Sequence, residues 1–86
     1  MAYNIVFTKQ ATKVLQKIPA TTITSIRQKI EQIAEDPFLP QPNVTKLQNR
    51  ADYRLRVGDW QIIYEVQQEK ILVIVLKIGL RKEVYR

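Results

Sequence analysis

The sequence contains no cysteine and no histidine. Without cysteine the protein cannot have a disulfide framework, a thiolate zinc site or a cysteine nucleophile. Without histidine it lacks the side chain whose proton exchange lies closest to neutral pH. Any reaction catalysed by these 86 residues must therefore use arginine, lysine, tyrosine, serine, threonine or carboxylate side chains.

Long hydrophobic segments are also missing. The longest apolar run, Ile71 to Leu76, is far shorter than the roughly 18 residues that indicate a membrane-spanning helix. Residues 1–10 do not have the charged start and apolar stretch of a secretory signal. We therefore expect a soluble, cytoplasmic protein in which residues 1–86 form a single domain.

Basic residues outnumber acidic residues by 14 to 8, which gives a formal net charge of +6. The excess is larger in the second half of the chain: residues 1–43 carry a net charge of +2 and residues 44–86 a net charge of +4. A positive charge on a small chain favours a polyanion or an acidic protein as partner. The alternative is that the charge serves only solubility.

The first residues combine a short strand with an amphipathic helix. Alternating apolar side chains predict a strand over residues 3–7. Apolar residues then recur at helical spacing, which predicts a helix over residues 9–18. Thr8 offers a hydroxyl cap at its start, and Pro19 should end it.

A second helix is predicted over residues 21–35, with Thr21 or Thr22 as its cap. Asp36-Pro37 should stop it, and the proline-rich segment 37–42 should be an ordered connection. A narrow isoleucine stripe should face the core: Ile23, Ile26, Ile30 and Ile33.

From residue 43 onward the apolar period changes to two. Strands are predicted over residues 44–47, 53–57, 60–66 and 71–78. The last of these is almost entirely apolar and should be central and covered on both faces. The predicted fold is α+β in the order β-α-α-β-β-β, with two N-terminal helices packed on one face of a twisted, mainly antiparallel sheet of four to five strands.

A two-residue turn at Gly58-Asp59 fixes which side chains share a face of the sheet. The face that carries Trp60 should contact the helices. The opposite face carries Arg54, Arg56 and Gln61. Two arginines at alternate positions of a strand can each bind a phosphate through paired hydrogen bonds. The alternative interpretation is an ordinary solvated sheet face.

The second hairpin, with its turn over residues 67–70, pairs Ile63 with Ile74 and Gln61 with Leu76. These pairs predict a shallow groove with an apolar floor beside the two arginines.

Arg81 and Tyr85 follow the last predicted strand and should close one end of this groove. An aromatic ring beside cationic side chains is a common way to hold single-stranded RNA. The alternative for Tyr85 is packing on the sheet edge. The lysines of the first helix, Lys9, Lys13 and Lys17, are most simply a solvated helix face.

Two sequence blocks, Tyr53–Val66 and Ile78–Tyr85, together resemble the RelE/ParE superfamily of bacterial toxins, and its RelE branch most closely. The segment from Tyr3 to Leu15 and the pair Lys46-Leu47 also fit that pattern, so the resemblance covers essentially the whole chain.

The resemblance implies the toxin of a type II toxin–antitoxin system, an enzyme that cuts mRNA on the ribosome. RelE-like enzymes use no metal or other cofactor: a 2′-hydroxyl of the message attacks the adjacent phosphate. The implied partners are a cognate antitoxin, the ribosome and mRNA, with no membrane partner, and the toxin would be held in a toxin–antitoxin hetero-oligomer.

The resemblance also implies roles for individual residues. The catalytic residues would be Arg54, Arg56, Arg81 and Tyr85. The further RNA-binding residues would be Lys46, Arg50, Gln61 and Lys82. The chain departs from the pattern at Gln61, where many RelE-like chains have arginine, and at Leu80, where many have histidine.

Two alternatives remain at this point. The chain could be a ParE-like inhibitor of DNA gyrase, with the same fold but no RNA chemistry. It could also be an inactive module that binds an antitoxin or a nucleic acid. Arginine is a poor general base because it stays protonated. Glu65 or Glu83 could accept the proton, although a surface salt bridge is the simpler role for each.

Overall fold

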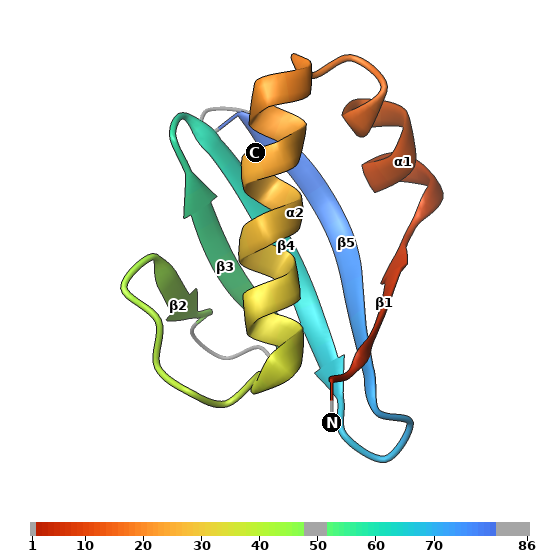
Figure 1. The fold of residues 1–86 in the computed structure, drawn as a ribbon. Coiled ribbons are helices and arrows are strands. Elements are labelled where there is room, and N and C mark those ends of the chain that lie inside the picture. The colour runs from red at the N-terminus through yellow and green to blue at the C-terminus, as the bar shows by residue number, and fades with distance from the viewer. Residues whose placement is uncertain (1, 48–51, 81–86) are drawn as a thin grey trace.

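The computed structural model describes residues 2–47 and 52–80 (Figure 1). Arg50, Arg81, Lys82 and Tyr85 lie outside the described residues. The elements follow the chain in this order: β1 (Asn4–Phe7), α1 (Lys9–Leu15), α2 (Ala20–Glu35), β2 (Val44–Lys46), β3 (Asp52–Val57), β4 (Trp60–Gln67) and β5 (Leu72–Leu80). The predicted α+β class is confirmed, and the order differs from β-α-α-β-β-β only in having four strands instead of three after the helices.

The strands form a single five-stranded sheet in the order β1-β5-β4-β3-β2. β1 pairs with β5 in parallel, and the three other neighbouring pairs are antiparallel. Figure 1 shows both helices on the viewer's side of the sheet, with α2 crossing it along β4 and α1 beside β1 and β5. In the described part of the chain, no helix covers the opposite face.

α1 begins as predicted but ends early. The side chain of Thr8 caps it by accepting a hydrogen bond from the backbone N–H of Ala11 at 3.2 Å. The helix ends at Leu15, three residues before the predicted end, because the chain tightens into turns there. In these turns Ile18 donates its backbone N–H to the carbonyl of Leu15 and is itself buried. The short turns therefore place an apolar side chain in the core just before Pro19.

α2 begins at Ala20, with Pro19 in the cap position and no side-chain hydrogen bond at this end. The expectation that Thr21 or Thr22 caps the helix is wrong, since both lie within its first turn. The φ angle of proline is fixed at a value that suits the start of a helix. Pro19 therefore occupies the position where a hydroxyl cap was expected. The helix ends at Glu35, with Asp36 in the C-cap position, as predicted. No helix within residues 2–47 and 52–80 combines the length and the apolar character needed to cross a membrane.

The core lies between α2 and the sheet. Ile26, Ile30 and Ile33 of the predicted stripe are buried, and Ile23 packs against them at the margin. They meet buried side chains of three strands: Leu55, Ile62, Tyr64, Val73, Val75 and Ile78. Trp60 is half-buried and packs against the same cluster, as the alternation along β4 predicts.

Beyond the end of β1, two side chains take over its pairing with β5. The Thr8 hydroxyl donates to the carbonyl of Leu76 at 2.7 Å. The Gln10 carboxamide donates to the carbonyl of Ile78 at 3.3 Å and accepts from the N–H of the same residue at 3.2 Å. Side chains at the start of α1 therefore continue the hydrogen bonds that β1 makes with β5.

The hairpin of β3 and β4 has the predicted register. Val57 lies opposite Trp60 across a two-residue turn, and Arg56 lies opposite Gln61. Gly58 has a φ of +59°, a conformation that side-chain-bearing residues rarely adopt. This turn fixes the faces of β3 and β4, so Arg54 and Arg56 lie on the side away from the helices.

The predicted register of the second hairpin is wrong. Gln67 lies opposite Leu72, so the loop comprises residues 68–71 instead of 67–70. Ile71 is not the first strand residue but a turn residue with a φ of +52°. β-branched residues favour strands and seldom adopt a positive φ. The sequence therefore predicts that Ile71 begins the last strand, and this prediction is wrong.

A β-bulge between Ile63 and Tyr64 shifts the register further. Ile63 lies opposite Lys77, not Ile74, and Gln61 lies opposite Gly79, not Leu76. The predicted apolar floor is therefore replaced by a mixed surface. The expectation that the last strand is covered on both faces is also wrong for the described residues, because Lys77 is exposed.

Tyr64 is fully buried on the helix side, and its ring stacks on Tyr53 with the ring centres 5.3 Å apart. Its hydroxyl has no hydrogen-bond partner in the described part of the chain. A buried polar group without a partner costs about 1–3 kcal/mol of desolvation. Burial, and to a lesser extent Tyr53, raises the pKa of Tyr64 well above its usual value of 10.0.

Replacing Tyr64→Phe should therefore keep the ring stack and raise the free energy of unfolding by about 1 kcal/mol. The wild-type protein should also lose stability as the pH rises above 10.0, because tyrosine ionises there in the unfolded chain but not in the folded one. Urea unfolding at neutral and alkaline pH measures both effects. A lower stability of the Tyr64→Phe protein at neutral pH would mean that the hydroxyl is satisfied in solution.

Candidate nucleic-acid interface

The face of the sheet away from the helices, here called the open face, carries two rows of side chains from β3, β4 and β5. Residues that lie directly opposite each other on neighbouring strands share a face. The first row consists of Arg56, Gln61 and Gly79. The second row consists of Arg54, Ile63 and Lys77.

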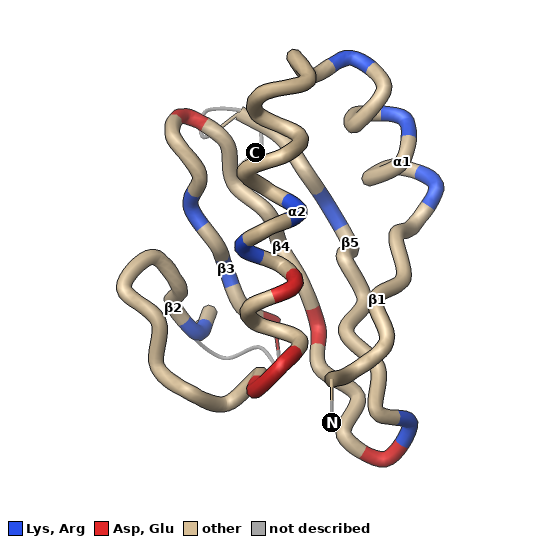
Figure 2. Tube along the Cα trace, in the orientation of Figure 1, with Lys and Arg blue, Asp and Glu red and all other residues tan. Residues whose placement is uncertain are grey.

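Three cationic side chains therefore share the open face. Arg54 and Arg56 come from β3 and are half-buried, whereas Lys77 comes from β5 and is exposed. Figure 2 shows these charges along β3 and near the middle of β5. Guanidinium groups offer paired donors to phosphate oxygens, and an ammonium adds a point charge. This arrangement can bind a polyanion.

Gln61 is the most unusual residue of this face. Its side chain is 1% exposed, which makes it the buried polar residue of the described chain. Neither its Nε2 nor its Oε1 atom has a hydrogen-bond partner there, and the buried Nε of Arg56 has none either. Because such groups are almost always paired in folded proteins, three unpaired atoms on two facing residues require an explanation.

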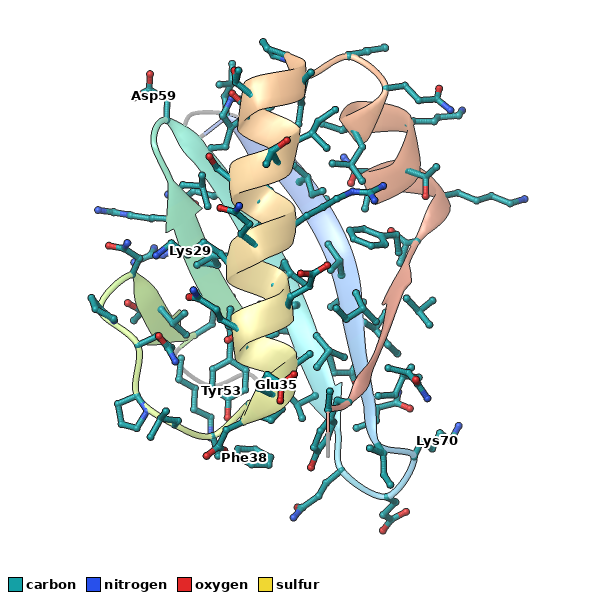
Figure 3. The ribbon with its side chains drawn as sticks, in the orientation of Figure 1. Lys29, Glu35, Phe38, Tyr53, Asp59 and Lys70 are labelled. Carbon is teal, nitrogen blue, oxygen red and sulfur yellow. The ribbon has the colours of Figure 1, made fainter. Side chains whose placement is uncertain are left out.

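A small hollow opens beside these atoms, lined by Arg56, Gly58, Asp59 and Gln61. Asp59 sits at the tip of the turn between β3 and β4, and its carboxylate points away from the sheet (Figure 3). The hollow therefore lies next to Arg56 and Gln61, whose three unpaired atoms remain buried, and its one acidic residue is directed outward.

Lys77 was not among the residues expected from the sequence. The predicted register placed it on the helix side, and the bulge in β4 and β5 moves it to the open face. One signal was present: Lys77 interrupts an otherwise apolar strand. A lysine is almost never fully buried, so its position marks the side of the strand that faces solvent.

The structure does not bring every expected residue to the open face. Lys46 lies opposite Tyr53 and therefore belongs to the other face of the sheet. Glu65 lies on the open face, but between Asp52 and Ile74, one row beyond Arg54. Its Oε1 accepts a hydrogen bond from Gln67 Nε2 at 3.4 Å.

A family model described as "ParE toxin of type II toxin-antitoxin system, parDE" matches residues 5–85. The chain belongs to this toxin family. The resemblance to the RelE/ParE superfamily is thereby confirmed.

Relatives of this ParE-family toxin carry the RelE name. The mRNA interferase toxin RelE of Escherichia coli K12 is 28% identical over 87 residues, which cover 99% of this chain and 92% of the relative. The toxin in the E. coli RelBE complex superimposes with a TM-score of 0.80 at 26% identity and covers 92% of this chain and 96% of its own. The RelE–RelB complex of Pyrococcus horikoshii gives a TM-score of 0.82 at 26% identity, with 96% of this chain and 99% of that chain covered.

Proposed function

We propose that this RelE-like toxin is a ribosome-dependent mRNA endonuclease that acts in the cytoplasm and needs no metal ion. The observation that carries the proposal is the pair of guanidinium groups of Arg54 and Arg56 on an open sheet face, with Lys77 on the same face two strands away. The name of the E. coli relative, an mRNA interferase, supports the same substrate.

In this reaction the 2′-oxygen of one nucleotide forms a bond to the adjacent phosphorus, and the bond from phosphorus to the 5′-oxygen breaks. The 2′-hydroxyl loses its proton to water, and the leaving 5′-oxygen takes a proton from water. Negative charge grows on the phosphate oxygens as the bonds change. Fixed cations directed at such charge are often the largest single contribution to catalysis.

Each residue is assigned a role from its position on the sheet. Arg54 and Arg56 would hold the scissile phosphate, since they project from adjacent same-face positions of β3. Lys77 would attract the message from β5. Arg81 is proposed as a third phosphate ligand and Tyr85 as a base-stacking residue, on the resemblance alone.

The proposed protein partner is a cognate antitoxin that silences the toxin in a hetero-oligomer. RelE proteins of similar fold have been solved as complexes with RelB. The net charge of +6 favours an acidic antitoxin.

The proposal is tested by inducing the protein in growing bacteria without an antitoxin. We expect growth arrest and mRNA ends that fall within translated reading frames. The matched control is the Arg54→Ala, Arg56→Ala double variant, which should fold but leave growth unaffected. Arrest accompanied by DNA breaks would instead identify a gyrase inhibitor, and normal growth with the wild-type protein would identify an inactive binding module.

A further inference from the structure

A hollow lies at the edge of the sheet where β1 has ended. The pairing of β1 with β5 stops at Phe7 and Val75, so α1 and not a strand lies beside the last residues of β5. The Gln10 carboxamide holds α1 there through both backbone groups of Ile78. A volume of about 340 Å³ remains open, here called the edge hollow. Its lining residues are Gln10, Val14, Lys17, Trp60 and residues 77–80.

The edge hollow combines apolar walls with two cations that a ligand can reach. Lys17 and Lys77 are its charged lining residues among the described part of the chain, and both are exposed. Leu80 is 38% exposed, and Val14 and Trp60 are half-buried. Binding sites for small ligands have volumes of about 300–1,000 Å³ and the same combination of apolar walls with a few polar groups.

The segments that form the edge hollow carry no acidic side chain. The first acidic residue of the sequence is Glu31, far beyond α1, and β5 contains none. Figure 2 shows basic residues on α1 and β5 and no acidic residue on either element. The electrostatic potential around Lys17 and Lys77 is therefore positive and attracts an anion.

Trp60 also lines a second hollow of about 380 Å³, which serves as a comparison within the same structure. That hollow contains the hydroxyl-bearing residues Thr21, Thr22 and Ser25, and its charged lining residue among the described ones is Asp59. The two hollows thus share an aromatic residue but differ in charge. A polyanion that contacts Trp60 is directed to the edge hollow.

Lys77 connects the edge hollow with the open face, because it belongs to both. Neighbouring strands of a sheet lie about 4.8 Å apart, so β5 lies about 10 Å from β3 and its two arginines. Stacked nucleotides of one strand rise about 3.4 Å each, so at most about three of them cover this distance. An RNA strand held at Arg54 and Arg56 therefore reaches the edge hollow with a nearby nucleotide.

We propose that the edge hollow binds one unpaired nucleotide of the message, a short distance along the strand from the scissile phosphate. The base stacks on the indole of Trp60, and the phosphates that flank it pair with Lys17 and Lys77. Stacking on an aromatic ring accepts any base, so this contact holds the strand without selecting a sequence. The inference rests on the proposed function and adds to it a contact outside the open face.

The first test locates the nucleotide. Ribosomes are programmed with messages whose 2′-deoxy sugar at the cleavage position prevents cutting. A single abasic site then replaces, in turn, each nucleotide within three of the cut that is not paired with a tRNA. Fluorescence anisotropy of the labelled toxin gives each Kd. One position should weaken binding about fivefold or more, the contribution of one base stacked on an aromatic ring, and the others should stay within about twofold.

The second test assigns that nucleotide to the edge hollow. Val14→Phe enlarges a wall residue and should weaken binding of the intact message about fivefold, with no further loss at the sensitive abasic position. Lys17→Glu reverses a charge at the hollow and should also weaken binding about fivefold. Lys13→Glu is the matched control, since it makes the same change at an exposed residue of α1 that does not line the hollow. Its Kd should stay within about twofold of wild type.

Several results would overturn the inference. Wild-type protein that cuts mRNA but tolerates every abasic site would refute it and leave the proposed function intact. Equal losses in Lys17→Glu and Lys13→Glu would mean that the strand is attracted by net charge alone. If Lys17→Glu and Val14→Phe bind the message normally but escape neutralisation by the cognate antitoxin in growing cells, the hollow belongs to the antitoxin.

Two further outcomes separate the inference from the fold and from the proposed function. A lower Tm of Val14→Phe and Lys17→Glu, with unchanged binding of the message, would mean that the hollow is filled by the chain itself. Wild-type protein that does not cut uncapped, unmodified messages on programmed ribosomes would refute the proposed function itself.

Discussion

The Arg56→Ala protein should cut mRNA on programmed ribosomes about 10²- to 10³-fold more slowly than wild type under single-turnover conditions. Arg56 lies directly opposite Gln61 and lines the hollow of the open face, so its removal takes away a fixed cation at the proposed phosphate position. Arg56→Lys should recover only part of the rate, because an ammonium cannot reproduce the paired donors of a guanidinium.

The matched control is Arg27→Ala. Arg27 is an exposed residue of α2, on the side of the sheet away from the open face. This change removes the same charge from the molecule and should leave the cleavage rate within about twofold of wild type, since exposed charges far from a site are largely screened by salt. Equal losses in both variants would mean that net charge, and not the open face, determines the rate.

The second large effect concerns stability. Ile30→Ala should lower the free energy of unfolding by about 2–5 kcal/mol, measured by urea denaturation. Ile30 is fully buried between α2 and the sheet, so its truncation leaves a cavity. Small domains are stable by only about 5–15 kcal/mol, so this one substitution should remove a large part of the total.

Ile23→Ala provides the comparison, because Ile23 belongs to the same isoleucine stripe but is only half-buried. Its truncation should cost clearly less than that of Ile30. A similar loss at both positions would indicate that the first turn of α2 packs more tightly in solution than its burial suggests.

The elements that the sequence predicts correctly are those whose signals are local. The hydroxyl of Thr8, the isoleucine spacing of α2 and the glycine of the β3–β4 turn each act over a few residues, and each has the predicted structure. The short turn also fixes the register of its hairpin, so the placement of Arg54 and Arg56 on one face followed from the sequence alone.

The errors arise where geometry depends on distant contacts. Ile71 has a strand-forming side chain but occupies a turn with positive φ, and no local pattern announces this. The bulge between Ile63 and Tyr64 shifts β5 by one further position and brings Lys77 to the open face. The unpaired state of Gln61 depends on which neighbours surround it in space, and composition cannot reveal that.

The side-chain contacts of Thr8 and Gln10 with β5 have a consequence for self-association. An uncovered sheet edge is a template on which a second chain can add a strand and begin to aggregate. β1 presents only four residues for such addition, and beyond it Gln10 already occupies both hydrogen-bonding groups of Ile78. An incoming strand would first have to displace the start of α1. The start of α1 therefore protects this edge of the sheet against uncontrolled polymerisation.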